Sequence, residues 1–365
     1  MSNDAHVPVL LHGARTPFTR FQGALASLPA HELGAHAIRG ALDAAGVAAT
    51  DVDAVIMGQV IQAGGGQGPA RRAAIAAGIG WDVPTVTINK LCLSGLTAII
   101  DAARLIRTGE ASVVVAGGQE SMTNAPHLVL GSRKGFAFGD VTMADSLTHD
   151  GLRDPFDGQI MGEATDRGCA TRGIGRGEQD EYAARSHTLA AAAREEGRLA
   201  EEIAPVTVPQ RKGDPVVVAD DEGIRPGTTV EALARLRPAF VEDGTITAGS
   251  SSPLSDGAAA VVVVSKAFAL SRGLTWLAEI RSAGQVAGPD NSLHSQPARA
   301  ITHALEREGM KADELDLVEI NEAFAAVALQ SVEDLGIDPG LVNTDGGAIA
   351  LGHPVGASGA RLALH

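Results

Sequence analysis

Short apolar runs alternate with helical spacing of apolar residues along the first third of the chain. The apolar runs predict strands at residues 7–12, 54–59, 83–88 and 112–116. Helical spacing predicts helices at residues 31–45, 69–77 and 96–106, and glycines follow closely after the first and third of them. Strands separated by helices of this length predict a parallel sheet with helices on both faces.

The pattern changes between about residues 119 and 248, which are more charged and irregular and contain one long polar helix, predicted at 178–197. A strand at 258–265 then resumes the earlier pattern. The rest of the chain predicts strands at 274–283, 315–320 and 342–343 and helices at 297–308 and 323–335. We therefore expect an α/β fold of two related halves, with a subdomain inserted into the first.

Composition and charge narrow the class of protein. The chain is 45% hydrophobic with a mean hydropathy of +0.09, which is typical of a globular protein. A net charge of −15 without a basic cluster argues against nucleic-acid binding. The longest apolar runs, such as 258–264, are too short to span a membrane. Cys92 and Cys169 form neither a disulfide framework nor a metal-ligand pair, so we expect a reduced, cytoplasmic protein without a metal or cofactor.

Cys92 is the first candidate for chemistry. It lies between a predicted strand and a predicted helix, in Asn-Lys-Leu-Cys-Leu-Ser-Gly-Leu at 89–96. Free amide N–H groups and the helix dipole at such a position favour a thiolate, which predicts a lowered thiol pKa. A buried structural cysteine is the alternative, and this segment alone does not decide between a reactive and a structural role.

Two further segments place polar side chains at turns. Residues 343–361 are rich in glycine and hold His353 beside Pro354, where it could act as a general base or oxyanion donor. Asn321 and Glu322 follow a predicted apolar strand, where open α/β sheets bind ligands, and Glu322 could orient a neighbouring side chain there. The alternatives are a solvated turn for His353 and a helix N-cap for Asn321.

Together these segments resemble the three motifs of the thiolase family. The resemblance rests on Cys92 with Ser-Gly-Leu at 94–96, on Asn-Glu-Ala-Phe-Ala at 321–325 and on the glycines around His353. Segments 117–126 and 244–249 add to it, and the matches follow one another in the family's order. The resemblance implies two stacked α/β halves with an inserted loop domain. We expect residues 1–120 and 250–273 in the first half, 121–249 in the loop domain and 274–365 in the second half.

The resemblance also implies an activity and a set of residues. It implies ping-pong acyl transfer between coenzyme A (CoA) thioesters, with Cys92 as nucleophile, His353 as its activating base and Asn321 holding a water in an oxyanion hole. Arg225 is expected near the nucleotide end of CoA. The remaining acyl and pantetheine contacts are expected from Leu152, Met161, Leu233, Phe240, Ala248, Ser252, Leu254, Ala323 and Phe324. Acyl-CoA and CoA are the expected partners, and the family implies a homodimer or homotetramer.

The sequence departs from the family at two places. Ile160 stands where many short-chain biosynthetic members have histidine. A second cysteine in a Cys-x-Gly context is missing, because the sequence stops at His365 and Cys169 lies elsewhere. We therefore expect an incomplete C-terminal half with an unpaired sheet edge.

Three activities remain open from the sequence. The first is acetyl-CoA C-acetyltransferase activity, which joins two acetyl-CoA molecules into acetoacetyl-CoA. The second is a degradative 3-ketoacyl-CoA thiolase for longer chains. The third is a non-catalytic acyl-CoA-binding protein. A ketoacyl synthase is less favoured, because that class pairs its cysteine with two histidines.

Overall fold

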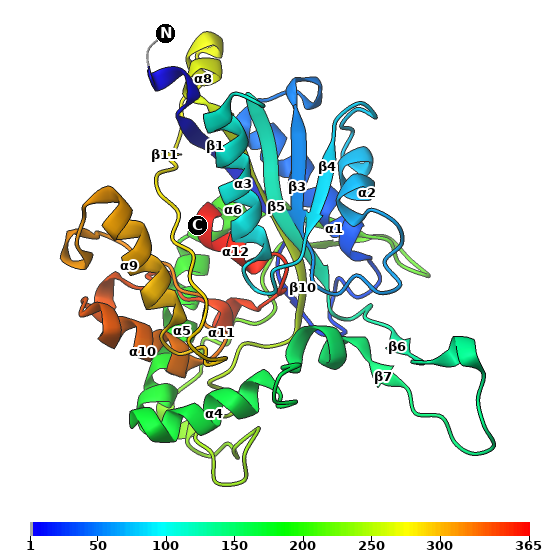
Figure 1. Ribbon diagram of the computed structural model, residues 1–365, viewed down its shortest axis with the longest axis vertical. Coiled ribbons are helices and arrows are strands. Elements are labelled where there is room, and N and C mark those ends of the chain that lie inside the picture. Colours follow the sequence, from blue (N-terminus) through cyan, green and yellow to red (C-terminus); the bar gives the residue numbers. More distant parts are fainter. Residues whose placement is uncertain (1–2) are drawn as a thin grey trace.

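A seven-stranded mixed sheet forms the centre of the computed structural model, which describes residues 3–365 (Figure 1). Its order is β11–β1–β10–β5–β3–β4, and β2 pairs with β10. The strands are β1 (Pro8–Arg15), β2 (Thr19–Arg20), β3 (Ala54–Gly58), β4 (Thr85–Ile88), β5 (Val113–Ser121), β10 (Ser255–Ser265) and β11 (Ala278–Glu279).

The sheet is not wholly parallel, so that part of the prediction is wrong. β3 is parallel to β4 and β5, whereas β10 is antiparallel to both β5 and β1. Parallel neighbours here are joined through a helix, as the spacing predicted. β10 instead returns after the long middle segment, and that connection lets it enter from the opposite direction.

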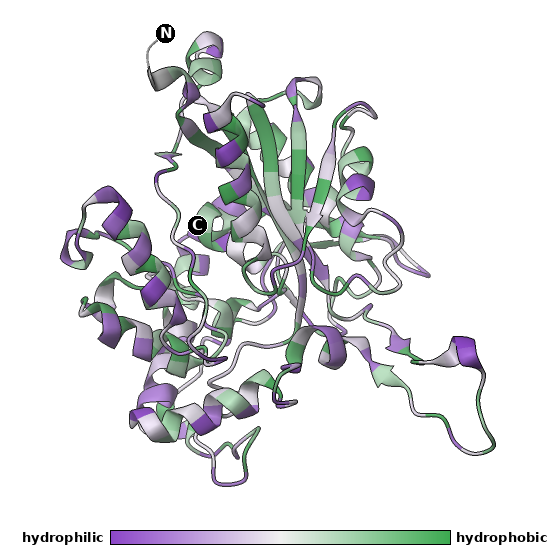
Figure 2. Cartoon of the chain, viewed as in Figure 1, coloured by the Kyte–Doolittle hydropathy of each residue, from purple (hydrophilic) through white to green (hydrophobic). Residues whose placement is uncertain are grey.

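Helices cover both faces of this sheet. Helices α1 (Ala30–Ala45) and α2 (Pro69–Ala76) pack on one face, and α3 (Ser94–Thr108) and α12 (Ser358–Leu364) pack on the other. The strands β3 and β5 are among the most hydrophobic parts of the chain (Figure 2). Val114, Val115 and Ala116 of β5 are fully buried, because they lie in the middle of a sheet covered on both sides.

The middle segment contributes an arm and a group of helices. The arm, residues 126–145, projects from the body and contains β6 (His127–Leu128) and β7 (Ala144–Asp145) (Figure 1). The π-helix η4 (Leu147–Leu152) follows it. The other elements are α4 (Met161–Arg172), α5 (Arg176–Glu195), α6 (Arg198–Glu202), the β8 (Val206–Val208) and β9 (Val216–Val218) pair, and α7 (Val230–Leu233).

A buried ion cluster ties the middle segment to the sheet. Arg15 of β1 is fully buried and pairs with Asp221 at 2.7 Å and with Glu202 at 2.6 Å. Each of these charges has a partner of opposite sign, which offsets the cost of removing it from water.

The segment after β10 is mostly helical. It contains α8 (Lys266–Arg272), α9 (Gln296–Glu308), α10 (Ala325–Leu335) and α11 (Ala348–Leu351) before α12. α10 and α11 pack against α5 of the middle segment.

Three strands predicted in this segment differ from the structure. Only Ala278 and Glu279 of 274–283 form a strand, and that strand pairs with β1. Residues 315–320 and 342–343 are joined by a single parallel bridge between Val318 and Val342. The apolar pattern detects burial, but a ladder also needs a neighbouring strand. Leu277 and Leu317, which the pattern placed in strands, are 62% and 68% exposed.

The predicted division at 1–120 with 250–273, 121–249 and 274–365 stays a prediction, and residues 1 and 2 lie outside the described part. Within residues 3–365, no helix has the length and apolar character needed to cross a membrane.

Candidate active site

Cys92 lies in a tight turn between the end of β4 and the start of α3. Leu91 adopts a left-handed conformation with φ of 50°, which directs the chain sharply into the helix. The Ser94 hydroxyl closes this turn, because it accepts from the Lys90 N–H at 2.8 Å and donates to the Leu91 carbonyl at 2.6 Å. The regular strand and helix on either side thereby fix the position of the thiol.

His353 reaches the thiol from the opposite side. Its Nε2 atom lies 3.2 Å from Cys92 Sγ, although 261 positions separate the two residues. His353 is 6% exposed and follows Gly352, whose φ of 119° is accessible mainly to glycine. The backbone N–H of His353 donates to Ser255 Oγ at 3.1 Å, which connects the histidine to β10.

Asn321 completes the group. Its amide nitrogen lies 3.4 Å from His353 Nε2. The alternative role of Asn321 as a helix N-cap does not hold, because α10 begins later and Phe324 is its N-cap. The structure therefore brings Cys92, His353 and Asn321 together from three separate segments.

Glu322 holds this corner of the site in place. It is fully buried, and its carboxylate accepts from Tyr182 Oη at 3.0 Å and from Ser186 Oγ at 2.7 Å. It also accepts from Asn343 Nδ2 at 2.9 Å and from the Ile349 N–H at 3.1 Å. The sequence suggested that Glu322 orients a neighbour, and these four donors are the neighbours it contacts.

The electrostatics of the pair favour neutral groups. Burial raises the pKa of the Cys92 thiol to about 11; its own backbone N–H opposes this shift, and Glu120 adds to it. The predicted lowering of this pKa is therefore wrong, because loss of water around the sulfur outweighs the helix N-terminus. Burial lowers the pKa of His353 to about 4, and the charge of Arg361 acts in the same direction. At neutral pH the pair is a thiol beside a neutral imidazole.

Leu152 is the predicted acyl contact that shares a hydrophobic cluster with Cys92. It and Cys92 pack against the same apolar cluster, and the members of that cluster are at most 5% exposed. They are Val60, Ile61, Met122, Leu147 and Val355. The side of Cys92 that faces the protein interior is thus closely filled by apolar side chains.

A second group of predicted contacts packs around Phe324. Phe240 meets Phe324 edge-on, with ring centroids 5.8 Å apart. Met161 and Ala323 belong to the same apolar cluster as Phe324. Two further residues join this group to β10 and His353: Ser252 donates through its N–H to the Ala323 carbonyl at 3.0 Å, and Leu254 bridges to His353.

The other three predicted contacts, Arg225, Leu233 and Ala248, line a cavity of about 160 Å³. Arg20 and His187 also line it, and the sequence did not single them out. Burial lowers the pKa of His187 to about 4, and its Nδ1 accepts from the Arg225 N–H at 3.3 Å. Neither residue belongs to a glycine-rich or motif segment, so only the folded chain reveals them.

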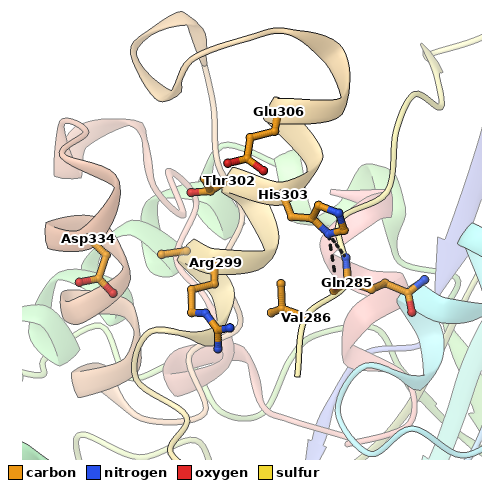
Figure 3. Close-up of a pocket in the computed structure, with 8 residues that line it drawn as sticks. Gln285, Val286, Arg299, Thr302, His303, Glu306 and Asp334 are labelled. Atoms are coloured by element: carbon orange, nitrogen blue, oxygen red, sulfur yellow. Dashed lines mark hydrogen bonds between the residues drawn. The ribbon is translucent and has the colours of Figure 1, made fainter. Parts of the chain in front are cut away.

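A second cavity, of about 630 Å³, shares no lining residue with the first (Figure 3). It is bordered by α9, by Asp334 of α10 and by Gln285 and Val286. Arg299, His303 and Glu306 line it from α9 and Asp334 lines it from α10, so basic and acidic side chains are mixed in its wall. No residue predicted to bind substrate lines it, and we place the chemistry at Cys92.

Cys169 has its own set of contacts, which does not include Cys92 or His353. It is fully buried in α4, where its Sγ donates to the Thr165 carbonyl at 3.4 Å and lies 3.7 Å from His294 Nε2. Among residues 3–365, no group of three or more His, Cys, Asp or Glu side chains could hold a metal ion.

A thiol in hydrogen-bond contact with a neutral imidazole, at the end of a strand in a helix-covered sheet, defines the class of cysteine nucleophile enzymes. The family model for the thiolase N-terminal domain matches residues 8–267, and the model for the thiolase C-terminal domain matches residues 274–365. The chain belongs to the thiolase family.

Curated relatives and a solved structure agree with this assignment. A "Probable acetyl-CoA acetyltransferase" of Mycobacterium tuberculosis is 59% identical over 98% of this chain and 91% of its own length. An acetyl-CoA acetyltransferase of Cupriavidus necator is 49% identical over 97% of this chain and 90% of its own length. The crystal structure of the Bacillus anthracis acetyl-CoA acetyltransferase is 40% identical, with a TM-score of 0.95 over 100% of this chain and 92% of that one.

The model for the thiolase C-terminal domain matches residues 274–365, and the chain covers 90 to 92% of the lengths of these three relatives. The end of the chain is also well packed. Ala360 of α12 is fully buried against α3 and the sheet, and the His365 ring contacts Glu202 at 3.1 Å and Asp345 at 3.4 Å.

Proposed function

We propose that this enzyme is an acetyl-CoA C-acetyltransferase that condenses two acetyl-CoA molecules, reversibly, into acetoacetyl-CoA and CoA. The observation that carries the proposal is the 3.2 Å contact between Cys92 Sγ and His353 Nε2. The names of the relatives support the substrate, and acyl-CoA and CoA are the proposed ligands.

The first half of the reaction follows from this contact. Cys92 Sγ attacks the thioester carbonyl carbon of acetyl-CoA while its proton passes to His353 Nε2. The tetrahedral intermediate then expels the CoA thiolate, which takes that proton and leaves as CoA. The acetyl group remains on Cys92 as a thioester. In this reaction Asn321 holds a water beside His353 that donates to the developing oxyanion.

The packing behind Cys92 favours a short acyl group. The apolar residues on that side are almost fully buried and packed against one another. A long acyl chain would have to displace several of them, whereas a methyl group would not. The degradative thiolase for longer chains is the alternative. Comparing acetoacetyl-CoA with a long-chain 3-ketoacyl-CoA tests this, and a higher kcat/KM for the long chain would overturn the short-chain proposal.

The two cysteines of the chain provide a matched test of the nucleophile. We expect [14C]acetyl-CoA to label wild type and Cys169→Ala, but not Cys92→Ala. Acetoacetyl-CoA cleavage by CoA should fall by at least about 10³-fold in Cys92→Ala, since a covalent route is lost. Label on Cys92→Ala would overturn the role of Cys92. Labelling of wild type without any carbon–carbon bond formation would favour the acyl-CoA-binding alternative.

We propose that the cavity beside Arg20 and Arg225 receives the phosphate-bearing end of CoA. Two guanidinium groups beside an apolar channel suit a polyanion attached to a less polar arm. Reversing the charge with Arg225→Glu should raise KM for acetyl-CoA more than it lowers kcat. An unchanged KM would contradict this placement.

We further propose a homodimer built on the β4 edge of the sheet. β4 ends the strand order, and Val86, Leu91 and Leu93 nearby are 53%, 39% and 53% exposed. Such an edge is an aggregation hazard unless another strand or chain covers it. Val86→Lys should reduce the mass measured by light scattering, whereas Leu270→Lys on α8 should not. A mass unaffected by Val86→Lys would exclude this edge as the interface.

The arm offers a second contact, by which two dimers would form a tetramer. Its Leu130, Phe138 and Met143 side chains are 59%, 110% and 60% exposed on a segment that projects from the body. Replacing all three by serine should convert tetramers to dimers. We place the enzyme in the cytoplasm, where its two free cysteines stay reduced, and propose that it needs no cofactor.

A further inference from the structure

The Nδ1 side of the His353 ring has a partner of its own. Ser358, the first residue of α12, lies with its Oγ 2.5 Å from His353 Nδ1. Ser358 is 1% exposed, so water does not compete freely for its hydroxyl. Its position five residues after His353 places both groups on the same turn.

The hydroxyl hydrogen of Ser358 is donated to an acceptor other than His353. Ser358 Oγ donates to the Pro354 carbonyl at 3.1 Å, four residues earlier, as serines in the first turn of a helix commonly do. A hydroxyl has one hydrogen to give and two lone pairs to accept with. Because the hydrogen is directed to Pro354, the oxygen can only accept on the side that faces the ring. The hydrogen in the contact with His353 must therefore belong to Nδ1.

A neutral imidazole carries one N–H, so a hydrogen on Nδ1 leaves a lone pair on Nε2. Nε2 is the atom that faces Cys92 Sγ at 3.2 Å and the Asn321 amide nitrogen at 3.4 Å. Both neighbours can donate hydrogen bonds to that lone pair. The opposite tautomer would present an N–H to the thiol and could not receive its proton.

We propose that Ser358 is a positioning residue that selects the Nδ1–H tautomer of His353, and so makes Nε2 the proton acceptor for Cys92. The proposal rests on the proposed function, in which His353 takes the thiol proton. Ser358 touches neither the sulfur nor the substrate. Its effect passes through the hydrogen-bond chain from the Pro354 carbonyl to Ser358 Oγ, to the ring and then to the thiol.

The wild-type protein gives the first test without any substitution. The 15N chemical shifts of histidine-labelled protein distinguish a ring nitrogen that bears hydrogen from one that does not, and loss of signals in His353→Gln identifies those of His353. At neutral pH we expect hydrogen on Nδ1 and none on Nε2. Hydrogen on Nε2 would overturn the proposal.

Substitutions at Ser358 give the second test. Ser358→Ala removes the acceptor, so we expect mixed tautomers and a roughly tenfold lower rate of Cys92 alkylation by iodoacetamide at one fixed pH, because the base is no longer held in its accepting form. Thr and Val have the same shape. Ser358→Thr should therefore restore the wild-type shifts and rate, and Ser358→Val should not.

Ser331 supplies the matched control. It is also fully buried in a helix and donates to a carbonyl four residues earlier, that of Val327 at 2.7 Å, but it lies in α10 and does not contact His353. Ser331→Ala should leave both readouts unchanged. Equal effects of Ser331→Ala and Ser358→Ala, or no effect of Ser358→Ala, would overturn the proposal.

The outcomes separate this proposal from the proposed function. A protein with Nδ1–H and fast alkylation but no acyl transfer would contradict only the function. A protein with full acyl transfer and Nε2–H would contradict only the role of Ser358.

Discussion

The sheet and the segment after it hold their active-site residues in different ways. Cys92 is placed by regular structure, since β4 leads into its turn and α3 leads out. Asn321 and His353 lie outside any strand, in a region whose backbone pairings are isolated bridges, and buried hydrogen bonds hold them in place. Repeating backbone hydrogen bonds fix the first region, whereas individual side chains fix the second.

Two buried carboxylates show this difference. Glu120, at the end of β5, accepts only backbone N–H groups, from Val60, Ile61 and Gly356, at 2.9, 3.2 and 3.1 Å. Glu322 accepts from three side chains and one backbone N–H. The first ties one backbone segment to another, and the second ties helix α5 to the loop that carries His353. A substitution that removes a side-chain donor can therefore weaken the contacts of Glu322, but not those of Glu120.

The largest effect should come from forcing the two regions apart. A Cβ at Gly118 in β5 would lie 1.9 Å from the Gly356 carbonyl oxygen, three residues after His353. Gly118→Ala must displace that backbone, which we expect to cost about 3 kcal/mol or more of unfolding free energy. A shift of about 1 Å in His353 would also reduce acylation roughly 100-fold.

Gly177 is the control for this substitution. It lies in α5 with no atom near its would-be Cβ, so Gly177→Ala should stabilise the protein by about 0.5–1 kcal/mol. Urea unfolding measures both variants. A Gly118→Ala protein as stable as wild type would show that the two regions are not in tight backbone contact.

The second prediction concerns the thiol of one region and the imidazole of the other. With the Cys92 pKa raised to about 11 by burial, the thiolate fraction grows about tenfold per pH unit below that value. Once the thiolate route exceeds the route assisted by His353, alkylation of Cys92 should rise about tenfold per pH unit and keep rising toward pH 11. A plateau near pH 7, measured by mass spectrometry, would mean that the pair rests as thiolate and imidazolium.

The sequence predicted the regular region better than the irregular one. The helix expected at 31–45 is Ala30–Ala45, because a single buried stripe and a terminal glycine suffice to define it. The strand expected at 315–320 forms one bridge only, because pairing depends on which segments are neighbours in space. The direction of the Cys92 pKa shift was wrong for a similar reason: local sequence reveals the helix end but not the desolvation.

The sequence also identified some residues of the site and missed others. Motif spacing marked Cys92, His353 and Asn321, because each stands at a recognisable turn. Ser358 and Arg20 were missed, since a serine at a helix start and an arginine on a short strand have common structural roles. Only the folded chain shows that Ser358 faces Nδ1 and that Arg20 borders the cavity.

The third prediction concerns a substitution, Glu322→Gln, that weakens only the segment after the sheet. Glu322→Gln keeps the shape but turns one acceptor into a donor facing another donor, which should cost about 2–3 kcal/mol of stability. Acylation should slow as well, because α11, which precedes His353, loses the hydrogen bond between the Ile349 N–H and the Glu322 carboxylate. Glu333→Gln, at an exposed position of α10, serves as the carboxylate-to-amide control. Equal stability of the two variants would refute the anchoring role of Glu322.

The smallest effect is expected at His294, which does not take part in the contact between the sheet and the segment after it. Burial, and then the charge of Arg172, lower the His294 pKa to about 4. Below pH 6.5 the unfolded chain takes up a proton there before the folded one, so this contribution to stability is lost as pH falls from about 6.5 to 4. Between pH 7 and 5 the loss is at most about 2 kcal/mol.

His294→Gln removes that titration, so its urea midpoint should fall less between pH 7 and 5 than that of wild type. His187 and His353, whose pKa values burial also lowers to about 4, titrate in both proteins and cancel in the comparison. His127→Gln, at an exposed position of the arm, is the matched histidine-to-glutamine control. If His294→Gln and wild type lose the same stability over this range, folded His294 takes up its proton over the same pH range as in the unfolded chain, and burial does not lower its pKa.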